Sequence, residues 1–297
     1  FSPGNLISTL LGILSDESDL TIRGYLTFVI GAQLINEETL PLEINFAQMA
    51  LGSADQQQIH SAILLFDNSL EYFKNADDEF IQFVNQLSST AVNFDDIQLI
   101  LDTLSFFFKF THLYHDIPDE LASDLWSKTI NLFPSLVDDV KNINELSQIV
   151  AESIDDNLVC VNVEPLLPIC IQLISSDDLD YNVRNSLTYV IDAIISIHSE
   201  FFVQSGMAVD IFRLYVQFAF DEYNPNEPLD KYDSSIMMNI CQTLSTYEEF
   251  LSMVWSAIKE FPEDDQGNYV SMIVLKYLFN AEVDFFYKFF DDIAGQI

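Results

Sequence analysis

Basic residues are few in this chain of 297 amino acids. Lys and Arg together number 11 against 47 Asp and Glu, which gives a formal net charge of −36. The basic residues are also scattered along the chain, from Arg23 to Lys288. Nucleic acids and anionic membrane surfaces attract clustered positive charge, so we expect neither as a partner.

Cysteine, glycine and proline are also scarce, with 3, 8 and 9 residues respectively. Three cysteines do not make a disulfide framework, and Cys160 and Cys170 have no neighbouring His for a zinc site, so we expect buried thiols in a reducing compartment. Arg23 interrupts the longest apolar run, which therefore falls short of the ~18 residues that cross a bilayer. The opening residues, Phe1 to Gly4, have neither a Met nor the basic stretch of a signal peptide, and we expect a piece of a longer protein.

Apolar side chains are abundant despite the charge. Hydrophobic residues make up 49% of the chain, with 25 Phe and 12 Tyr. That is enough to build a core, so the chain is expected to fold. The apolar residues recur mostly at spacings of three and four, as in the stretch from Leu6 to Leu14, and this spacing predicts an all-α fold.

One segment of the sequence recurs. Ser15 to Ile30 and Ser176 to Ile191 are identical at eight of sixteen positions, at an offset of 176 − 15 = 161 residues. That offset is four units of about 40 residues, the repeat length of HEAT and armadillo proteins. The sequence therefore predicts a HEAT/armadillo-type α-solenoid, a single right-handed superhelix of about seven helix pairs over residues 1–297. The alternative is a plain helical bundle with a chance similarity.

Each predicted repeat holds a helix A, a short acidic turn and a helix B. The predicted pairs are 4–14 with 19–36, 40–51 with 55–72, 77–90 with 94–113, 118–134 with 138–153, and 163–175 with 179–203. Further helices are predicted at 206–221, 233–244, 246–260, 267–280 and 282–294. Two Asp–Arg pairs stand at equivalent repeat positions, Asp19 with Arg23 and Asp180 with Arg184. At i, i+4 each pair would share one helix face, and we interpret both as scaffold residues that could link neighbouring repeats.

The sequence offers little for catalysis. It has no glycine-rich phosphate loop and no nucleophile elbow, so we expect no enzyme and no cofactor. His112 and His115 stand beside Asp116 and resemble half of a metal site, which leaves an all-α metal-dependent hydrolase as a minor alternative. No third ligand is indicated, and histidines at a helix C-terminus also suit the helix dipole.

Two further features could serve binding. Consecutive aromatic residues, as at Phe106 to Phe108, would pack between repeats or line a groove for apolar peptide side chains. An acidic segment at 221–233, broken by Pro225 and Pro228, reads as a loop inserted into the solenoid and serves either as a linker or as a binding element.

The stretch Glu164-Pro-Leu-Leu-Pro-Ile-Cys-Ile-Gln-Leu-Ile-Ser175, followed by acids and by Val183-Arg184, resembles the HEAT repeats of importin-β (karyopherin-β) nuclear transport receptors. The likeness is greatest to the large importins that carry ribosomal proteins and histones. It is concentrated in residues 160–260, and residues 1–150 resemble only generic HEAT units. Ile59-His60 and Ile97-Gln98 replace the usual Val-Arg pairs, so the chain would be a divergent member.

The resemblance implies a receptor of the cytoplasm, nucleus and nuclear pore whose acidic concave face binds basic cargo. It also implies regulation by RanGTP and contacts with Phe-Gly nucleoporins. Charge alone also favours basic protein partners. Candidate cargo or Ran contacts are the acids at B-helix starts and in the inserted loop: Asp138, Asp139, Asp177, Asp178, Asp221, Glu222, Glu227, Asp230 and Asp233. The alternative within binding proteins is a HEAT scaffold subunit of a multiprotein complex, of the phosphatase or vesicle-coat type.

Overall fold

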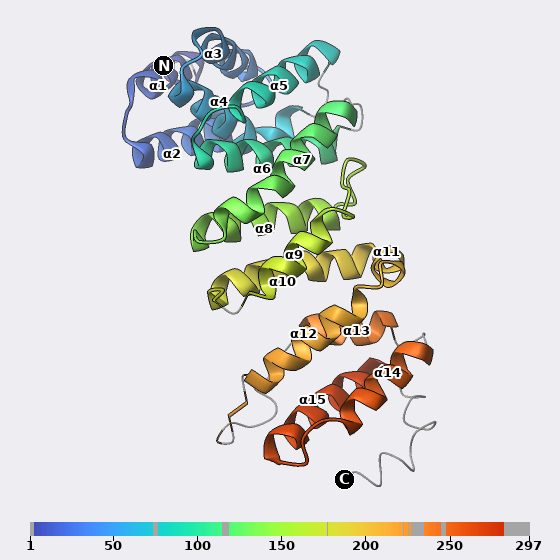
Figure 1. Ribbon diagram of the computed structural model, residues 1–297. Helices are drawn as coiled ribbons and strands as arrows, with labels where there is room; N and C mark the ends of the chain where they lie inside the picture. Colours follow the sequence, from blue (N-terminus) through green and yellow to red (C-terminus); the bar gives the residue numbers. More distant parts are fainter. Residues whose placement is uncertain are drawn as a thin grey trace. The chain divides into compact units, whose positions relative to one another are not determined.

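The computed structural model describes residues 3–73, 77–114, 119–176, 178–221, 223–224, 226, 235–244 and 248–281. Within these ranges the chain is all-helical and contains no strand (Figure 1). The expected all-α fold is therefore confirmed. No helix in these ranges is both long and apolar enough to cross a membrane.

The chain divides into two compact units, Phe1–Asn162 and Val163–Ile297. The helices of unit 1 are α1 (Pro3–Asp16), α2 (Leu20–Phe28), the π-helical turn η1 (Val29–Leu34), α3 (Leu40–Ser53), α4 (Gln56–Asn68), the 3₁₀ turn η2 (Leu70–Phe73), α5 (Asp78–Ala91), α6 (Ile97–Leu113), α7 (Asp119–Leu136) and α8 (Val140–Asp155). Those of unit 2 are α9 (Leu166–Ile174), α10 (Tyr181–Ile197), α11 (Ser199–Gln204), α12 (Ala208–Asp221), α13 (Ser235–Leu244), α14 (Glu248–Lys259) and α15 (Asp265–Ala281).

Unit 1 is built from consecutive helix pairs. The two helices of each pair pack on each other: α1 on α2, α3 on α4, α5 on α6 and α7 on α8. The second helices also pack on one another in the order α2, α4, α6, α8 (Figure 1). In unit 2, α9 packs on α10, α10 on α13, and α13 on both α12 and α15. We call α2, α4, α6, α8 and α10 the B helices, since they follow the short turn in each predicted pair.

Aromatic residues form much of the core of unit 1. Phe106, Phe107 and Phe108 are all buried, with exposures of 3% or less. Phe106 packs against Phe66 of α4 at a centroid distance of 6.0 Å, and Phe108 packs edge-on against Trp126 of α7 at 5.8 Å. Phe106 and Phe108 therefore join neighbouring helix pairs, and the burial of all three rings fits core packing rather than a groove for peptide side chains.

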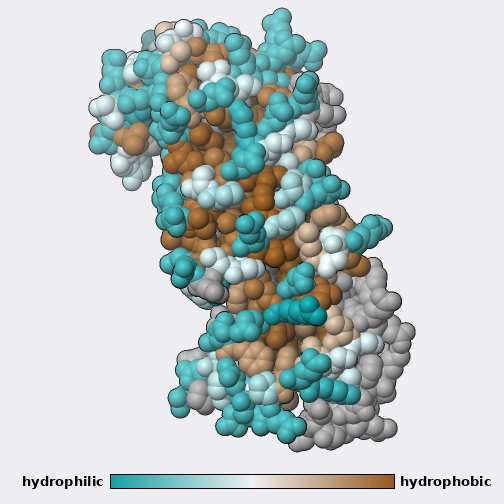
Figure 2. All heavy atoms as spheres, viewed as in Figure 1, coloured by the Kyte–Doolittle hydropathy of each residue, from teal (hydrophilic) through white to brown (hydrophobic). Residues whose placement is uncertain are grey.

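The surface of unit 1 is mixed rather than uniformly polar. Figure 2 shows hydrophilic residues around the rim of the visible face, with hydrophobic residues between them over α6 to α8. Sixteen large hydrophobic side chains of the described chain are exposed, and those of α2 are among the most exposed.

Some predicted helix bounds need correction. The segment 19–36 is an α-helix only to Phe28 and continues as the π-turn η1 to Leu34. The segment 179–203 ends its first helix at Ile197, because His198 leaves helical geometry with φ −112° and ψ 42°, and α11 follows. The predicted helix at 282–294 lies outside the described residues. Whether one solenoid spans both units stays a prediction.

Candidate functional site

Aspartates begin the B helices of unit 1. Asp19 Oδ1 accepts bonds from the backbone N–H groups of Thr21 and Ile22, at 2.9 and 3.1 Å. Asp55, Asp96 and Asp139 cap α4, α6 and α8 in the same way. A carboxylate at this position satisfies backbone donors that have no partner inside the helix, and it lies at the positive end of the helix dipole. A capping Asp therefore stands at the start of each B helix of unit 1.

Side-chain contacts bring these starts to one edge of unit 1. Gln56 Nε2 at the start of α4 donates to Asp96 Oδ2 at the start of α6, at 2.9 Å. Lys141 Nζ at the start of α8 donates to Gln98 Oε1 near the start of α6, also at 2.9 Å. Because the packed B helices run in the same direction, their caps and the neighbouring acids lie along one side. We call this row the acidic edge: Asp16, Glu17, Asp19, Asp55, Asp95, Asp96, Asp138 and Asp139.

Little positive charge offsets the acidic edge. Arg23 is the nearest cation by sequence, but only 4% of it is exposed. Burial lowers the pKa of Arg23, whereas the charges of Asp55, Asp96 and Glu17 act in the opposite direction. Elsewhere in unit 1, Lys109 pairs with Asp67 at 2.9 Å. Two described surface cations lie near the acidic edge: Lys128 donates to Asn93 in the turn before α6, and Lys141 donates to Gln98 near the start of α6. Acids outnumber these cations, so the row keeps a negative potential.

Side-chain contacts join each B helix of unit 1 to the next, and we call the following three contacts the ladder. Arg23 donates through Nη2 to Ser61 Oγ at 2.6 Å, and Gln98 Nε2 donates to Glu145 Oε1 at 3.0 Å. His60 Nε2 lies 2.6 Å from Asp102 Oδ2.

In each of these bonds, the residue on the later helix, which we call the receiving residue, stands at the same position relative to the start of its helix. Ser61, Asp102 and Glu145 each follow the N-cap aspartate of their own helix by six residues, counted from Asp55, Asp96 and Asp139. None of these receiving residues is predicted from the sequence. Their constant separation of six residues from the capping Asp is a sequence pattern that could have identified them.

The two repeat-equivalent Asp–Arg pairs behave differently from the expected i, i+4 pairs. Asp180 caps α10 by accepting from the backbone N–H of Asn182 at 2.8 Å, as Asp19 caps α2. Arg184 places its guanidinium carbon 4.2 Å from the centroid of the Phe218 ring. Within the described residues, neither arginine forms an ion pair with the aspartate that precedes it by four residues. The carboxylates turn towards the helix start, and the guanidinium groups reach another helix.

The predicted cargo contacts are only partly described. Asp138 and Asp139 are exposed and belong to the acidic edge, and Asp178 is exposed before α10. Asp221 ends α12 and accepts a bond from Gln217 at 2.9 Å. The remaining candidates lie outside the described residues: Asp177, Glu222, Glu227, Asp230 and Asp233.

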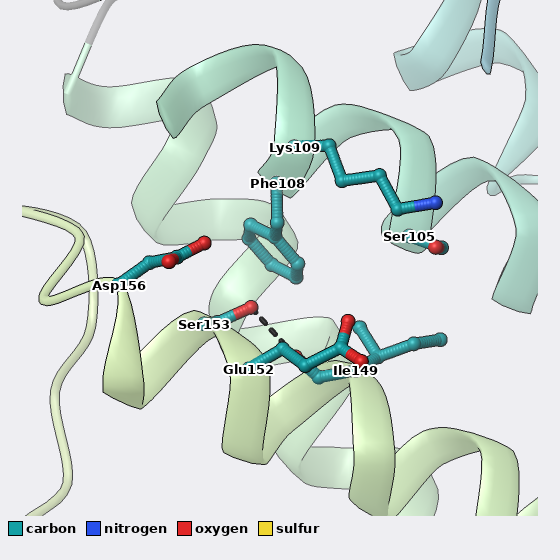
Figure 3. Close-up of a pocket in the computed structure, with 7 residues that line it drawn as sticks. All are labelled: Ser105, Phe108, Lys109, Ile149, Glu152, Ser153 and Asp156. Carbon is teal, nitrogen blue, oxygen red and sulfur yellow. Dashed lines mark hydrogen bonds between the residues drawn. The ribbon is translucent and has the colours of Figure 1, made fainter. Parts of the chain in front are cut away.

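A small hollow lies between α6 and α8. Its volume is about 20 Å³, room for roughly one water molecule. The residues that line it are Ser105, Phe108, Lys109, Ile149, Glu152, Ser153 and Asp156. In Figure 3 the Phe108 ring occupies the centre of this group, and the Ser153 hydroxyl donates to the Ile149 carbonyl rather than into the hollow. The hollow is too small for an organic substrate.

Of the two histidines that resemble half of a metal site, the structure describes only His112. His112 Nδ1 lies 3.6 Å from Asp156 Oδ2, and both side chains are about half exposed. His115 and Asp116 lie outside the described residues. Across the part of the chain that the structure describes, no group of three or more His, Cys, Asp or Glu is arranged to hold a metal ion.

Comparison with protein-family models finds no match for this chain, and comparison with the sequences of curated proteins finds no match either.

Proposed function

We propose that this chain is a non-catalytic HEAT-type solenoid that binds basic segments of other proteins along the acidic edge, as part of a nuclear import receptor. The observation that carries the proposal is the row of acids at the starts of four neighbouring B helices, near which the described residues place two surface cations, Lys128 and Lys141. A fixed row of like charges raises the local concentration of oppositely charged segments and accelerates their association.

Support for the solenoid comes from the order of packing within unit 1. Each B helix packs on the next, and the ladder bonds join residues 38 to 47 positions apart. Those separations match one repeat of a two-helix solenoid. In a bundle whose helices all meet around a common centre, contacts would not be confined to successive pairs.

The import-receptor part of the proposal rests on the resemblance to importin-β repeats, and it is tested by competition. The chain is immobilised and incubated with a Lys/Arg-rich signal peptide, with and without GTP-loaded Ran. The expected result is capture of the peptide at low salt and its release by Ran. Absence of binding at low salt would overturn the whole proposal. A stable partner without any Ran effect would favour a scaffold subunit instead.

The binding surface is tested by removing charge without removing the helix caps. Asn caps a helix as well as Asp does, so Asp95→Asn, Asp96→Asn, Asp138→Asn and Asp139→Asn together delete four charges while the fold is kept. We expect the affinity for the signal peptide to fall about tenfold, with a weaker salt dependence.

The matched control deletes four exposed acids at the opposite edge of unit 1. Because the helices of a pair are antiparallel, the start of α5 lies away from the start of α6. The control changes are Glu71→Gln, Asp77→Asn, Asp78→Asn and Glu79→Gln. Equal losses in the two variants would mean that only net charge matters and that the acidic edge is not the binding surface.

A further inference from the structure

The hollow between α6 and α8 is too small for an organic substrate, but it has room for the end of a side chain. Its volume of about 20 Å³ holds roughly one water molecule. The ammonium group of a lysine is similarly compact and is carried on a flexible aliphatic stem. The guanidinium group of an arginine is planar and contains several heavy atoms, so it does not fit in this volume. The hollow can therefore separate the two basic side chains by size.

Polar and apolar atoms both line the hollow. Glu152 and Asp156 bring carboxylates and Ser105 brings a hydroxyl group, and the oxygen atoms of all three can accept a hydrogen bond from an ammonium group. In Figure 3 the Phe108 ring lies between the carboxyl groups of Glu152 and Asp156. Phe108 and Ile149 supply apolar surface for the methylene groups of a lysine, which pack on apolar atoms while the charged end contacts polar ones. The lining thus matches both parts of a lysine side chain.

The hollow is negatively charged, although a lysine already lines it. Lys109 Nζ donates to both carboxylate oxygens of Asp67, at 2.9 and 3.2 Å, so the charge of Lys109 is balanced from α4. Asp156 Oδ2 lies 3.6 Å from His112 Nδ1. Glu152 is in the last turn of α8 and Asp156 is the C-cap residue, a place where the helix dipole also favours a cation. Both acids lie at the opposite end of the B helices from the acidic edge and do not belong to it.

We propose that the hollow binds the ammonium group of one lysine of a partner protein, and that it makes the chain prefer lysine to arginine at that position. The inference rests on the proposed function, because the lysine belongs to a basic segment of the kind that binds the acidic edge. Phe108 lies 108 − 97 = 11 residues after Ile97, the first residue of α6, which is roughly 16 Å along the helix. An extended segment covers that distance in about five residues. One short segment therefore reaches both surfaces.

The preference for lysine has the opposite sign to that of carboxylates on an open surface. Arginine binds such carboxylates through two parallel hydrogen bonds, so the acidic edge alone favours arginine. A preference for lysine therefore reports a site that restricts the size of the charged group, and net charge does not produce it.

Two peptides of equal charge test this site. Each has about ten residues, with Lys at alternate positions in one and Arg in the other, and is long enough to span the distance between the two surfaces. Their affinities for the full chain are measured by fluorescence anisotropy. We expect the Lys peptide to bind the wild type about threefold to tenfold more tightly than the Arg peptide, because only lysine gains the contacts of the hollow.

Two substitutions remove the site in different ways. Ser105→Leu fills the hollow and leaves every charge in place, whereas Glu152→Gln removes one carboxylate and leaves the space. Each should abolish the preference for the Lys peptide and change the affinity for the Arg peptide by no more than about twofold. The matched controls are Ser127→Leu at an exposed position of α7 and Glu79→Gln at an exposed position of α5, and both should keep the wild-type preference.

The variant with four Asn substitutions at the acidic edge separates the two proposals. It should lower the affinity for both peptides by a similar factor and keep the preference for lysine, because the two surfaces do not share residues. Equal affinities of the two peptides for the wild type would overturn the present proposal and would mean that the hollow holds only water. A lysine preference that persists in both Ser105→Leu and Glu152→Gln would overturn it as well. Binding of neither peptide would overturn this proposal together with the proposed function.

Discussion

Ser69 Oγ lies 2.6 Å from Glu43 Oε1 and 2.9 Å from the carbonyl oxygen of Leu65. One hydroxyl proton cannot be donated to both oxygens. The conflict disappears if Glu43 is protonated, because its carboxyl group then donates to Ser69 and Ser69 donates to Leu65. Glu43 is fully buried, and burial raises its pKa to about 8. The geometry and the pKa thus agree on a neutral carboxyl group at neutral pH.

This assignment predicts a stability that falls as pH rises. Between pH 4.5, the ordinary pKa of the group, and about pH 8, the folded chain holds a proton that the unfolded chain releases. The stabilisation that protonated Glu43 provides is therefore fully present below pH 4.5 and is lost as the pH rises to about 8. With ~1.4 kcal/mol per pKa unit, the loss is of the order of a few kcal/mol. Denaturant unfolding at several pH values measures it.

Glu43→Gln should remove this dependence, because an amide stays neutral. The variant should be close to the wild type at pH 5 and more stable above pH 8. Glu79→Gln, at an exposed position of α5, is the control and should keep the wild-type slope. A slope that survives in Glu43→Gln would show that Glu43 ionises in the folded state as it does in water.

The ladder bond between His60 and Asp102 should couple the stability of α4 to that of α6. The side chains are 12% and 21% exposed and their atoms approach to 2.6 Å, so a double-mutant cycle with His60→Ala and Asp102→Ala should give a coupling of about 1 kcal/mol. The pair Lys109 and Asp67 is more exposed, at 45% and 30%, and should give roughly half of that or less. Additive single and double variants at His60 and Asp102 would mean that the contact contributes nothing to the fold.

Helices and their caps were predictable from this sequence because both are encoded locally. The match between Ser15–Ile30 and Ser176–Ile191 placed Asp19 and Asp180 at helix starts, where both accept backbone bonds. The partner of Arg23 was not predictable in the same way, since Ser61 is 38 residues distant and only the packing of α2 on α4 brings it near. A Glu in so acidic a chain is expected to lie in solvent, and nothing in the neighbouring residues predicts that Glu43 is buried.

The buried thiols should be chemically inert in the folded chain. Cys170 and Cys241 are fully buried, and burial raises the pKa of each from 9.0 to about 12. Three pKa units lower the thiolate fraction about a thousandfold at pH 8, and access is blocked as well. Alkylation followed by peptide mass spectrometry should therefore find both cysteines slow to react in buffer and fast in denaturant. Rapid labelling in buffer would contradict the burial of these helices.

Gly31 marks the closest approach between two elements of unit 1. A Cβ atom at this position would lie 2.7 Å from Cβ of Asn68 and 2.9 Å from the carbonyl oxygen of Leu65, both in α4. Neither atom is the end of a flexible side chain, so Gly31→Ala must push η1 away from α4. We expect a loss of about 1 to 3 kcal/mol in the free energy of unfolding. The same shift would disturb Ser69, which shares the Leu65 carbonyl, so the pH dependence assigned to Glu43 should weaken in this variant.

Gly24→Ala is the matched control, because Gly24 lies seven residues earlier in α2 and a Cβ there meets nothing within 4 Å. Alanine favours a helix over glycine by up to ~1 kcal/mol, so this change should leave stability unchanged or raise it. Thermal and denaturant unfolding of the two variants decide the point. If both substitutions stabilised the chain, the π-turn would not be held against α4, and the contact that forces glycine at position 31 would be absent in solution.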